Sequence, residues 1–107
     1  MTILAPKAAL ALAARLLEAE GFTVVARNDR GDSFYLTLSE SPWHLRLSNH
    51  ARTAKQRARR TDILTSLVID APRSPDQVRI LVEGALKNYG AALALREAQA
   101  SVSGSRK

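Results

Sequence analysis

The sequence predicts an α+β fold, a two-layer sandwich in which two helices cover one face of an antiparallel sheet. Two observations point to it: the outer segments carry apolar residues at helical spacing, and central segments alternate apolar and polar residues. The 107 residues are enough for one hydrophobic core and too few for two. We therefore expect the order α-β-β-β-β-α, with one domain over residues 1–98 and a flexible polar tail over 99–107.

The first helix is predicted over residues 4–20. Pro6 suits a first helical turn, and Gly21 stands where a left-handed residue commonly follows the end of a helix. The apolar residues that recur at helical spacing are Ala9, Ala13, Leu16 and Leu17. With Arg15 and Glu18 off this apolar face, the segment is expected to be a folded helix and not a targeting segment.

Three strands are predicted next, over residues 22–28, 33–40 and 43–48. The first is rich in β-branched residues, and the other two alternate cleanly across a short polar join, which is typical of a hairpin. The apolar face of this hairpin carries Phe34, Leu36, Leu38, Trp43, Leu45 and Leu47. We expect the helices to cover that face, and the opposite face, with Tyr35, His44 and Arg46, to remain open.

A fourth strand is predicted over residues 62–70 and a final helix from about residue 75. The faces of this strand differ little, which indicates cover on both sides. Ser74 suits the helix N-cap, Pro75 the first position, and Gln77 the position that reaches back to the cap. The apolar stripe of the helix consists of Val78, Leu81, Val82, Ala85, Tyr89, Ala92 and Leu93. We expect the helix to end near Ala98.

Positive charge is concentrated in one segment, residues 49–62. Five cations and one acid give this segment a net charge of +4 out of +6 for the whole chain, so the other 93 residues carry only +2. A connection of this length in a small domain is usually functional or disordered. Guanidinium groups pair well with phosphates, so we interpret the segment as a phosphate-binding loop, against the alternative of a solvated loop that aids solubility.

The candidate binding residues are these cations together with neighbouring polar side chains. Tyr35 and Arg46 should lie on the same face of paired strands, where they can stack on bases or hydrogen-bond to a partner. The predicted binding set is Tyr35, His44, Arg46, His50, Arg52, Lys55, Arg57, Arg59 and Arg60.

Several classes of function are disfavoured. The chain has no cysteine, which excludes thiolate metal sites, and His44 and His50 have no carboxylate at ligand spacing. No phosphate-binding glycine loop, dinucleotide fingerprint or acidic cluster is present. We therefore expect no enzyme, no catalytic residues, no cofactor and no metal. No apolar run reaches the roughly 18 residues of a membrane span, and a cytoplasmic location is expected.

The stretch formed by Arg46, Ser48, Asn49 and His50 follows an aromatic strand and precedes a further strand. In this it resembles small proteins of phages and mobile elements, over about residues 33–70. The resemblance implies a mobile-element setting, in which such proteins often bind host machinery, including CRISPR effector complexes. The element order also resembles the double-stranded-RNA-binding domain, but Asp76 stands where that family has a cation, and the strand over 62–70 is additional.

The function expected from the sequence is that of a small non-enzymatic basic binding protein. It would engage DNA or RNA, or a host nucleoprotein complex, through residues 49–62. One alternative is a phage-type, anti-CRISPR-like inhibitor that acts by protein–protein binding. Another is a dimeric scaffold with an incidental basic loop, since the open sheet face and the Ala- and Leu-rich segment 91–100 also predict a twofold homodimer.

Overall fold

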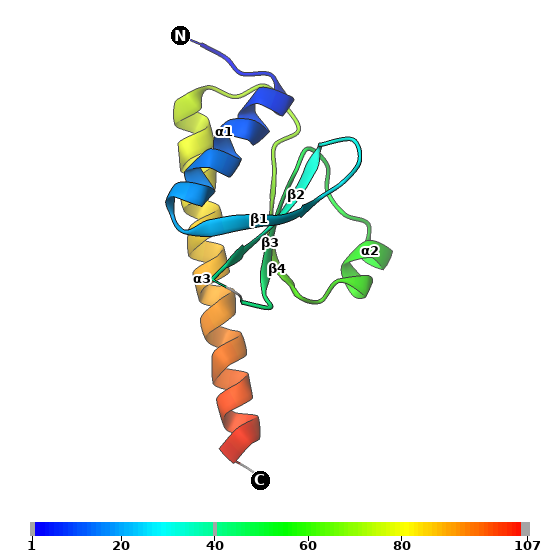
Figure 1. Cartoon of the computed structure of the whole chain (residues 1–107), viewed down its shortest axis with the longest axis vertical. Helices are drawn as coiled ribbons and strands as arrows, with labels where there is room; N and C mark the ends of the chain where they lie inside the picture. The colour runs from blue at the N-terminus through cyan, green and yellow to red at the C-terminus, as the bar shows by residue number, and fades with distance from the viewer. Residues whose placement is uncertain (1, 40, 106–107) are drawn as a thin grey trace.

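The computed structural model describes residues 2–39 and 41–105, with side chains as far as residue 99. It is an α+β fold, as predicted, with three helices and one sheet of four strands. The elements (Figure 1) are α1 (Pro6–Ala19), β1 (Phe22–Arg27), β2 (Ser33–Leu38), β3 (His44–Ser48), α2 (Ala54–Arg59), β4 (Ile63–Val68) and α3 (Pro75–Ser105). The helix α2 is an addition to the predicted order, and it lies within the basic segment.

The sheet has the order β1-β2-β3-β4 and is mixed. The pairs β1–β2 and β2–β3 are antiparallel, but β4 runs parallel to β3. The prediction of a fully antiparallel sheet was therefore wrong. Alternation of apolar and polar residues is the same in both kinds of strand, whereas adjacent parallel strands need a crossover of a dozen or more residues. Residues 49–62 are this connection, and we call them the basic crossover.

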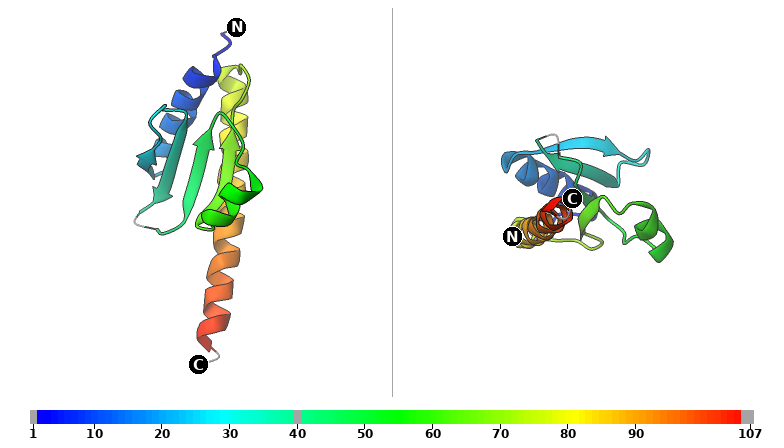
Figure 2. Two further views of the ribbon diagram at one scale, coloured as in Figure 1. Left: turned by 90° about the vertical axis from the view of Figure 1, so that its right-hand side faces the viewer. Right: turned by 90° about the horizontal axis from the view of Figure 1, so that it is seen from below.

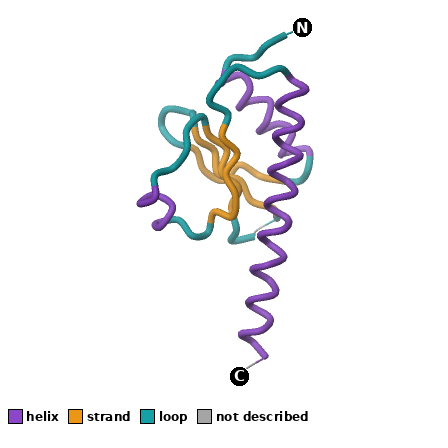
Figure 3. Tube along the Cα trace, turned by 180° about the vertical axis from the view of Figure 1, so that it is seen from behind, coloured by secondary structure: helices purple, strands orange, loops and turns teal. Residues whose placement is uncertain are grey.

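Helices lie on both sides of the strands. The helix α1 packs against β1, β3 and α3, and α3 packs against β4. Figures 1 and 3 show α1 and α3 together beside the sheet, with α2 beyond its other face. The simple two-layer sandwich predicted from the sequence is not confirmed, because the basic crossover adds structure on the side that was expected to be open.

The hydrophobic core lies between the sheet and the two long helices. Its fully buried side chains from the strands include Leu36, Leu45 and Leu47, which belong to the predicted apolar face. Trp43 is only partly buried and packs at the edge of the core, where its backbone carbonyl accepts a 2.8 Å hydrogen bond from the Tyr89 hydroxyl. Trp43 belongs to the apolar face that the helices were expected to cover, and the structure covers its ring only in part.

Local signals place the ends of the helices. Gly21 has a φ of +99°, a left-handed conformation that side chains other than glycine rarely adopt. At the start of α3, Ser74 and Gln77 form the predicted reciprocal cap, with N–H···O distances of 2.9 and 3.2 Å. The helix then continues to Ser105 instead of ending near Ala98. Of the predicted tail, residues 106–107 lie outside the described part of the chain.

The C-terminal part of α3 extends past the sheet, so the molecule is elongated, with principal dimensions of 56 × 27 × 20 Å (Figure 1). Leu95, on this extension, is 59% exposed. Within the described residues, no helix combines the length and the apolar character needed to cross a membrane.

Candidate functional site

The sheet face turned away from α1 and α3 is polar, yet much of it is buried. Ser33, Arg46 and Ser48 have exposed fractions of 2%, 2% and 0%. This face was predicted to be open, and that prediction was wrong. Figure 2 (left) looks onto this face and shows α2 in front of it at the β4 edge. Because β4 is parallel to β3, the chain must pass across the sheet between them, and the basic crossover does so here.

A cavity of about 280 Å³ lies between this polar face and α2. Its cationic lining residues are Arg30, Arg46, Arg52, Arg59 and Arg60. Its other lining residues are Asn28, Ser33, Tyr35, His50, Gln56 and Ile63. In the part of the chain that the structure describes, no carboxylate lines this cavity. The cavity therefore combines five positive charges with neutral hydrogen-bonding groups, a composition suited to an anion.

Arg46 is the most deeply buried of these arginines. It lies on β3 directly opposite Tyr35 of β2, which confirms the prediction that these two residues share a face of paired strands. One terminal guanidinium nitrogen donates a 2.9 Å hydrogen bond to the backbone carbonyl of His50. Its Nε is buried without a hydrogen-bond partner, and no ion pair within the described side chains involves Arg46. Burying a charge without a counter-charge costs free energy, so Arg46 is suited to bind an anionic group.

Arg60, by contrast, is already neutralised. Its guanidinium donates to both carboxylate oxygens of Asp62, at 2.9 and 3.2 Å, and lies 5.1 Å from the centroid of the Tyr35 ring. The hydrogen bond from Arg60 lowers the pKa of Asp62, and the same pair raises the pKa of Arg60. This pairing holds the end of the basic crossover against the wall of the cavity.

Arg52 and Arg59 have no carboxylate partner among the described residues. Arg52 donates only a long hydrogen bond of 3.4 Å, to the backbone carbonyl of Arg60. The pKa of Arg52 is lowered from its ordinary value. Burial is the largest cause, and the nearby charges of Arg46 and Arg57 add to it. An arginine nevertheless stays charged at neutral pH. Like charges are thus crowded together around the cavity, and a bound anion would relieve their repulsion.

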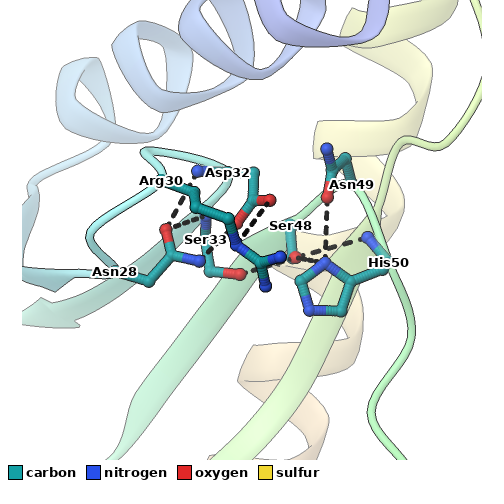
Figure 4. Close-up of polar contacts among 7 residues, drawn as sticks. All are labelled: Asn28, Arg30, Asp32, Ser33, Ser48, Asn49 and His50. Carbon is teal, nitrogen blue, oxygen red and sulfur yellow. Dashed lines mark hydrogen bonds and ion pairs between the residues drawn. The ribbon is translucent and has the colours of Figure 1, made fainter.

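A chain of polar contacts orders the rim of the cavity (Figure 4). The hydroxyls of Ser33 and Ser48 share a 2.8 Å hydrogen bond across the β2–β3 pair. The Ser48 hydroxyl lies 3.2 Å from Nδ1 of His50, which in turn lies 2.9 Å from Oδ1 of Asn49. Because Ser48 is fully buried, its hydroxyl cannot reach a substrate, and the contacts serve to fix His50 and its carbonyl beside Arg46.

The turn between β1 and β2 adjoins this chain of contacts at Ser33. Oδ1 of Asn28 accepts hydrogen bonds from the backbone N–H groups of Asp32 and Ser33, at 2.9 and 3.0 Å, and its amide nitrogen donates to the Asp32 carboxylate. This last hydrogen bond, with the charge of Arg30 nearby, lowers the pKa of Asp32. Nε of Arg30 lies 3.7 Å from that carboxylate. This contact keeps Arg30, which lines the cavity, beside the turn (Figure 4).

The basic crossover is itself locally ordered at α2. Thr53 and Gln56 form a capping box, with the Gln56 N–H donating to Oγ1 of Thr53 at 3.1 Å and the Thr53 N–H donating to Oε1 of Gln56 at 2.9 Å. All side chains of α2 are exposed. Lys55 and Arg57 therefore present their charges to solvent outside the cavity, while Arg59 lines it.

The structure brings together most of the residues predicted to bind a partner. The cavity unites Tyr35, Arg46, His50, Arg52, Arg59 and Arg60. His44 does not join them, and its Nδ1 lies 3.1 Å from a carboxylate oxygen of Asp62 instead. Sequence reasoning missed Asn28, Arg30, Ser33 and Gln56. Asn28 and Arg30 belong to a polar turn, and only the pairing of Ser33 with Ser48 shows that this turn reaches the cavity.

No group of three or more potential metal ligands lies together within residues 2–39 and 41–105. No family model, curated protein or solved structure matches the chain. The charges around the cavity and on α2 are thus the basis for assigning a function.

Proposed function

We propose that this protein binds nucleic acid through its phosphate backbone, using the cations of the basic crossover. The observation that carries the proposal is a capped helix, α2, whose cations are exposed to solvent beside a cavity lined by arginines. Lys55, Arg57 and Arg59 are exposed and have no carboxylate partner among the described side chains. Cations in such a position can exchange their solvent counterions for phosphates, which is the main source of sequence-independent affinity.

The arrangement favours backbone contact over base reading. Contacts to phosphate position a protein on nucleic acid, whereas sequence is read by side chains that reach base edges in a groove. The cations of α2 lie on one short helix of six residues, which is less than two turns. We propose a non-enzymatic binding role without a cofactor, and a cytoplasmic setting with which the absence of cysteine is compatible.

The test is the salt dependence of binding. The triple variant Lys55→Gln, Arg57→Gln, Arg59→Gln removes three charges from the basic crossover. A matched control, Lys7→Gln, Arg15→Gln, Lys87→Gln, removes three exposed charges from α1 and α3. Both variants and the wild type are titrated against mixed-sequence duplex and single-stranded oligonucleotides at several salt concentrations. Circular dichroism confirms that each protein is folded.

For the duplex, the triple variant should flatten the log–log salt slope by roughly 2–3, since each phosphate contact contributes about 0.9. The control should keep the wild-type slope. Equal flattening in both variants would mean that net charge alone matters, and wild-type protein that fails to bind either oligonucleotide at low salt would refute the proposal.

Two alternatives have their own signatures. An inhibitor of host machinery would use the same cations against an acidic protein surface, so the wild type would bind no nucleic acid but would capture a host nucleic-acid-binding complex from nuclease-treated lysate. A dimeric scaffold would use the exposed extension of α3 around Leu95. Sedimentation at micromolar concentration that shows only the 11.7 kDa monomer would remove the scaffold.

A further inference from the structure

The arginines around the cavity form a gradient of burial. Arg46 is 98% buried and Arg52 is half-buried, whereas Arg30, Arg59 and Arg60 are exposed. Arg60 and Arg30 already face carboxylates, at 2.9 and 3.7 Å. Arg46, Arg52 and Arg59 lack a counter-charge among the described side chains, and the first two of them are also the innermost. An anion that enters along this gradient meets rising positive charge and falling solvent access, both of which strengthen binding.

The charge of a suitable anionic ligand can be estimated from Arg46 and Arg52. Neutralising Arg46 and Arg52 requires about two negative charges in one small group. A phosphate monoester carries about −1.5 to −2 near neutral pH and has three acceptor oxygens. An internal phosphodiester carries a single charge. Fork-shaped guanidinium groups suit phosphate oxygens, so a monoester fits the innermost pair better than a diester does.

The size of the cavity also favours a terminal phosphate of a nucleic-acid strand over an internal phosphate. Its volume of about 280 Å³ lies just below the range of about 300–1,000 Å³ that is usual for small-molecule sites. An internal phosphate is flanked by a sugar on each side, so both sugars would have to enter before it reached the buried Arg46. A terminal phosphate has only one sugar behind it and can enter end-on.

We propose that the cavity beneath the basic crossover is a seat for a phosphate monoester, such as the terminal phosphate of a nucleic-acid strand or the phosphate of a free nucleotide. Arg46 and Arg52 supply its counter-charge, and the contact with the His50 carbonyl holds Arg46 in place. The choice of a strand end as the natural source rests on the proposed function. The cavity itself requires only the monoester.

The experiment compares single-stranded oligonucleotides of one sequence that carry a 5′-phosphate, a 3′-phosphate or only hydroxyl ends. A nucleoside 5′-monophosphate, the matching nucleoside and inorganic phosphate serve as competitors. One or both phosphorylated strands should bind at least about tenfold more tightly than the hydroxyl strand, the effect of one additional charge-assisted hydrogen bond. The monophosphate should displace the phosphorylated strand, and the nucleoside should not.

Two variants test the location of the seat. Arg46→Met and Arg52→Gln should each bring the ratio of affinities between phosphorylated and hydroxyl strands close to one. Arg52 lies on the basic crossover, so its substitution is informative even if the Arg46 variant fails to fold. The matched control Lys55→Gln, Arg57→Gln lies outside the cavity and should weaken binding to both strands while it keeps their ratio.

The possible results separate the two proposals. Equal binding of all strands would overturn the monoester seat and leave backbone binding intact. Binding of the monophosphate without any strand would support the seat and refute the proposed nucleic-acid function. A preference for phosphorylated ends that survives both cavity variants would overturn the assignment of this cavity.

Discussion

Replacing Arg46 with methionine should make the unliganded protein more stable, although it removes a buried side chain's hydrogen bond. In the structure, Arg46 is almost fully buried, has one hydrogen bond to the carbonyl of His50 and faces no carboxylate within the described side chains. Methionine has a similar length and adapts to irregular space, so the substitution leaves little void.

The magnitude follows from two opposing effects. Transfer of a charged group out of water costs several kcal/mol per ion, even after relaxation of the protein. The hydrogen bond from a charged donor to the His50 carbonyl offsets about 1.5–3 kcal/mol of that cost. We therefore expect the Arg46→Met variant to gain about 1–2 kcal/mol in free energy of unfolding when no anion is bound.

The assay is urea denaturation followed by the fluorescence of Trp43, the single tryptophan, in a buffer free of phosphate and sulfate. Arg15→Met is the control, because Arg15 is exposed on α1 and its replacement should change stability by less than about 0.5 kcal/mol. With a nucleoside monophosphate at 100 times its Kd, the wild type should gain about 2.7 kcal/mol. The Arg46→Met variant should gain almost nothing at the same ligand concentration.

A loss of more than about 1 kcal/mol in the Arg46→Met variant would refute this reasoning. It would mean that the guanidinium is satisfied within the fold and acts as a structural residue. Equal stabilisation of both proteins by the monophosphate would place the ligand elsewhere.

Two further predictions concern Asp62, which lies next to the cavity, and Trp43, which lies at the edge of the core. Asp62→Asn should raise the affinity for phosphate several-fold, because it frees Arg60 from its carboxylate partner. A calorimetric titration with inorganic phosphate measures this affinity. An unchanged affinity would show that Arg60 does not face the ligand. The pKa of Asp62 is lowered in the folded state, so its stabilising contribution is present above its unfolded pKa, near 4, and is lost as the pH falls through the folded value. Stability of the variant should therefore depend less on pH in this acidic range. Trp43→Ala should cost about 1–3 kcal/mol, less than the about 3–5 kcal/mol of a fully buried aromatic residue, because the ring is partly exposed beneath the guanidinium of Arg96. Thermal unfolding followed by circular dichroism measures this loss, and a value above about 4 kcal/mol would show that the ring is a central part of the core.

Features that depend on neighbouring residues could be predicted from the sequence. Gly21 after α1 and the Ser74–Gln77 cap of α3 are set by local backbone conformation and by hydrogen bonds that span three residues. The pairing of Tyr35 with Arg46 also follows from alternation across a short join. The candidate cations were identified because five of them stand close together in the chain.

The direction of β4 and the burial of Arg46 could not be predicted in this way. Alternation does not distinguish a parallel strand from an antiparallel one, and either direction of β4 allows a long connection after β3. Once β4 pairs in parallel, the basic crossover has to pass over the polar sheet face, and this brings Arg52 and Arg59 above Arg46.

The sequence by itself determined that positive charge is gathered in residues 49–62, because the composition of a segment does not depend on the fold. Only the tertiary structure decided that Arg52, Arg59 and Arg60 of this segment line a cavity, whereas Lys55 and Arg57 project into solvent. The physical reason is that burial and counter-charge are properties of groups far apart in the chain. Arg30 comes from the β1–β2 turn, Arg46 from β3 and Arg59 from α2, and they meet only because the crossover returns across the sheet.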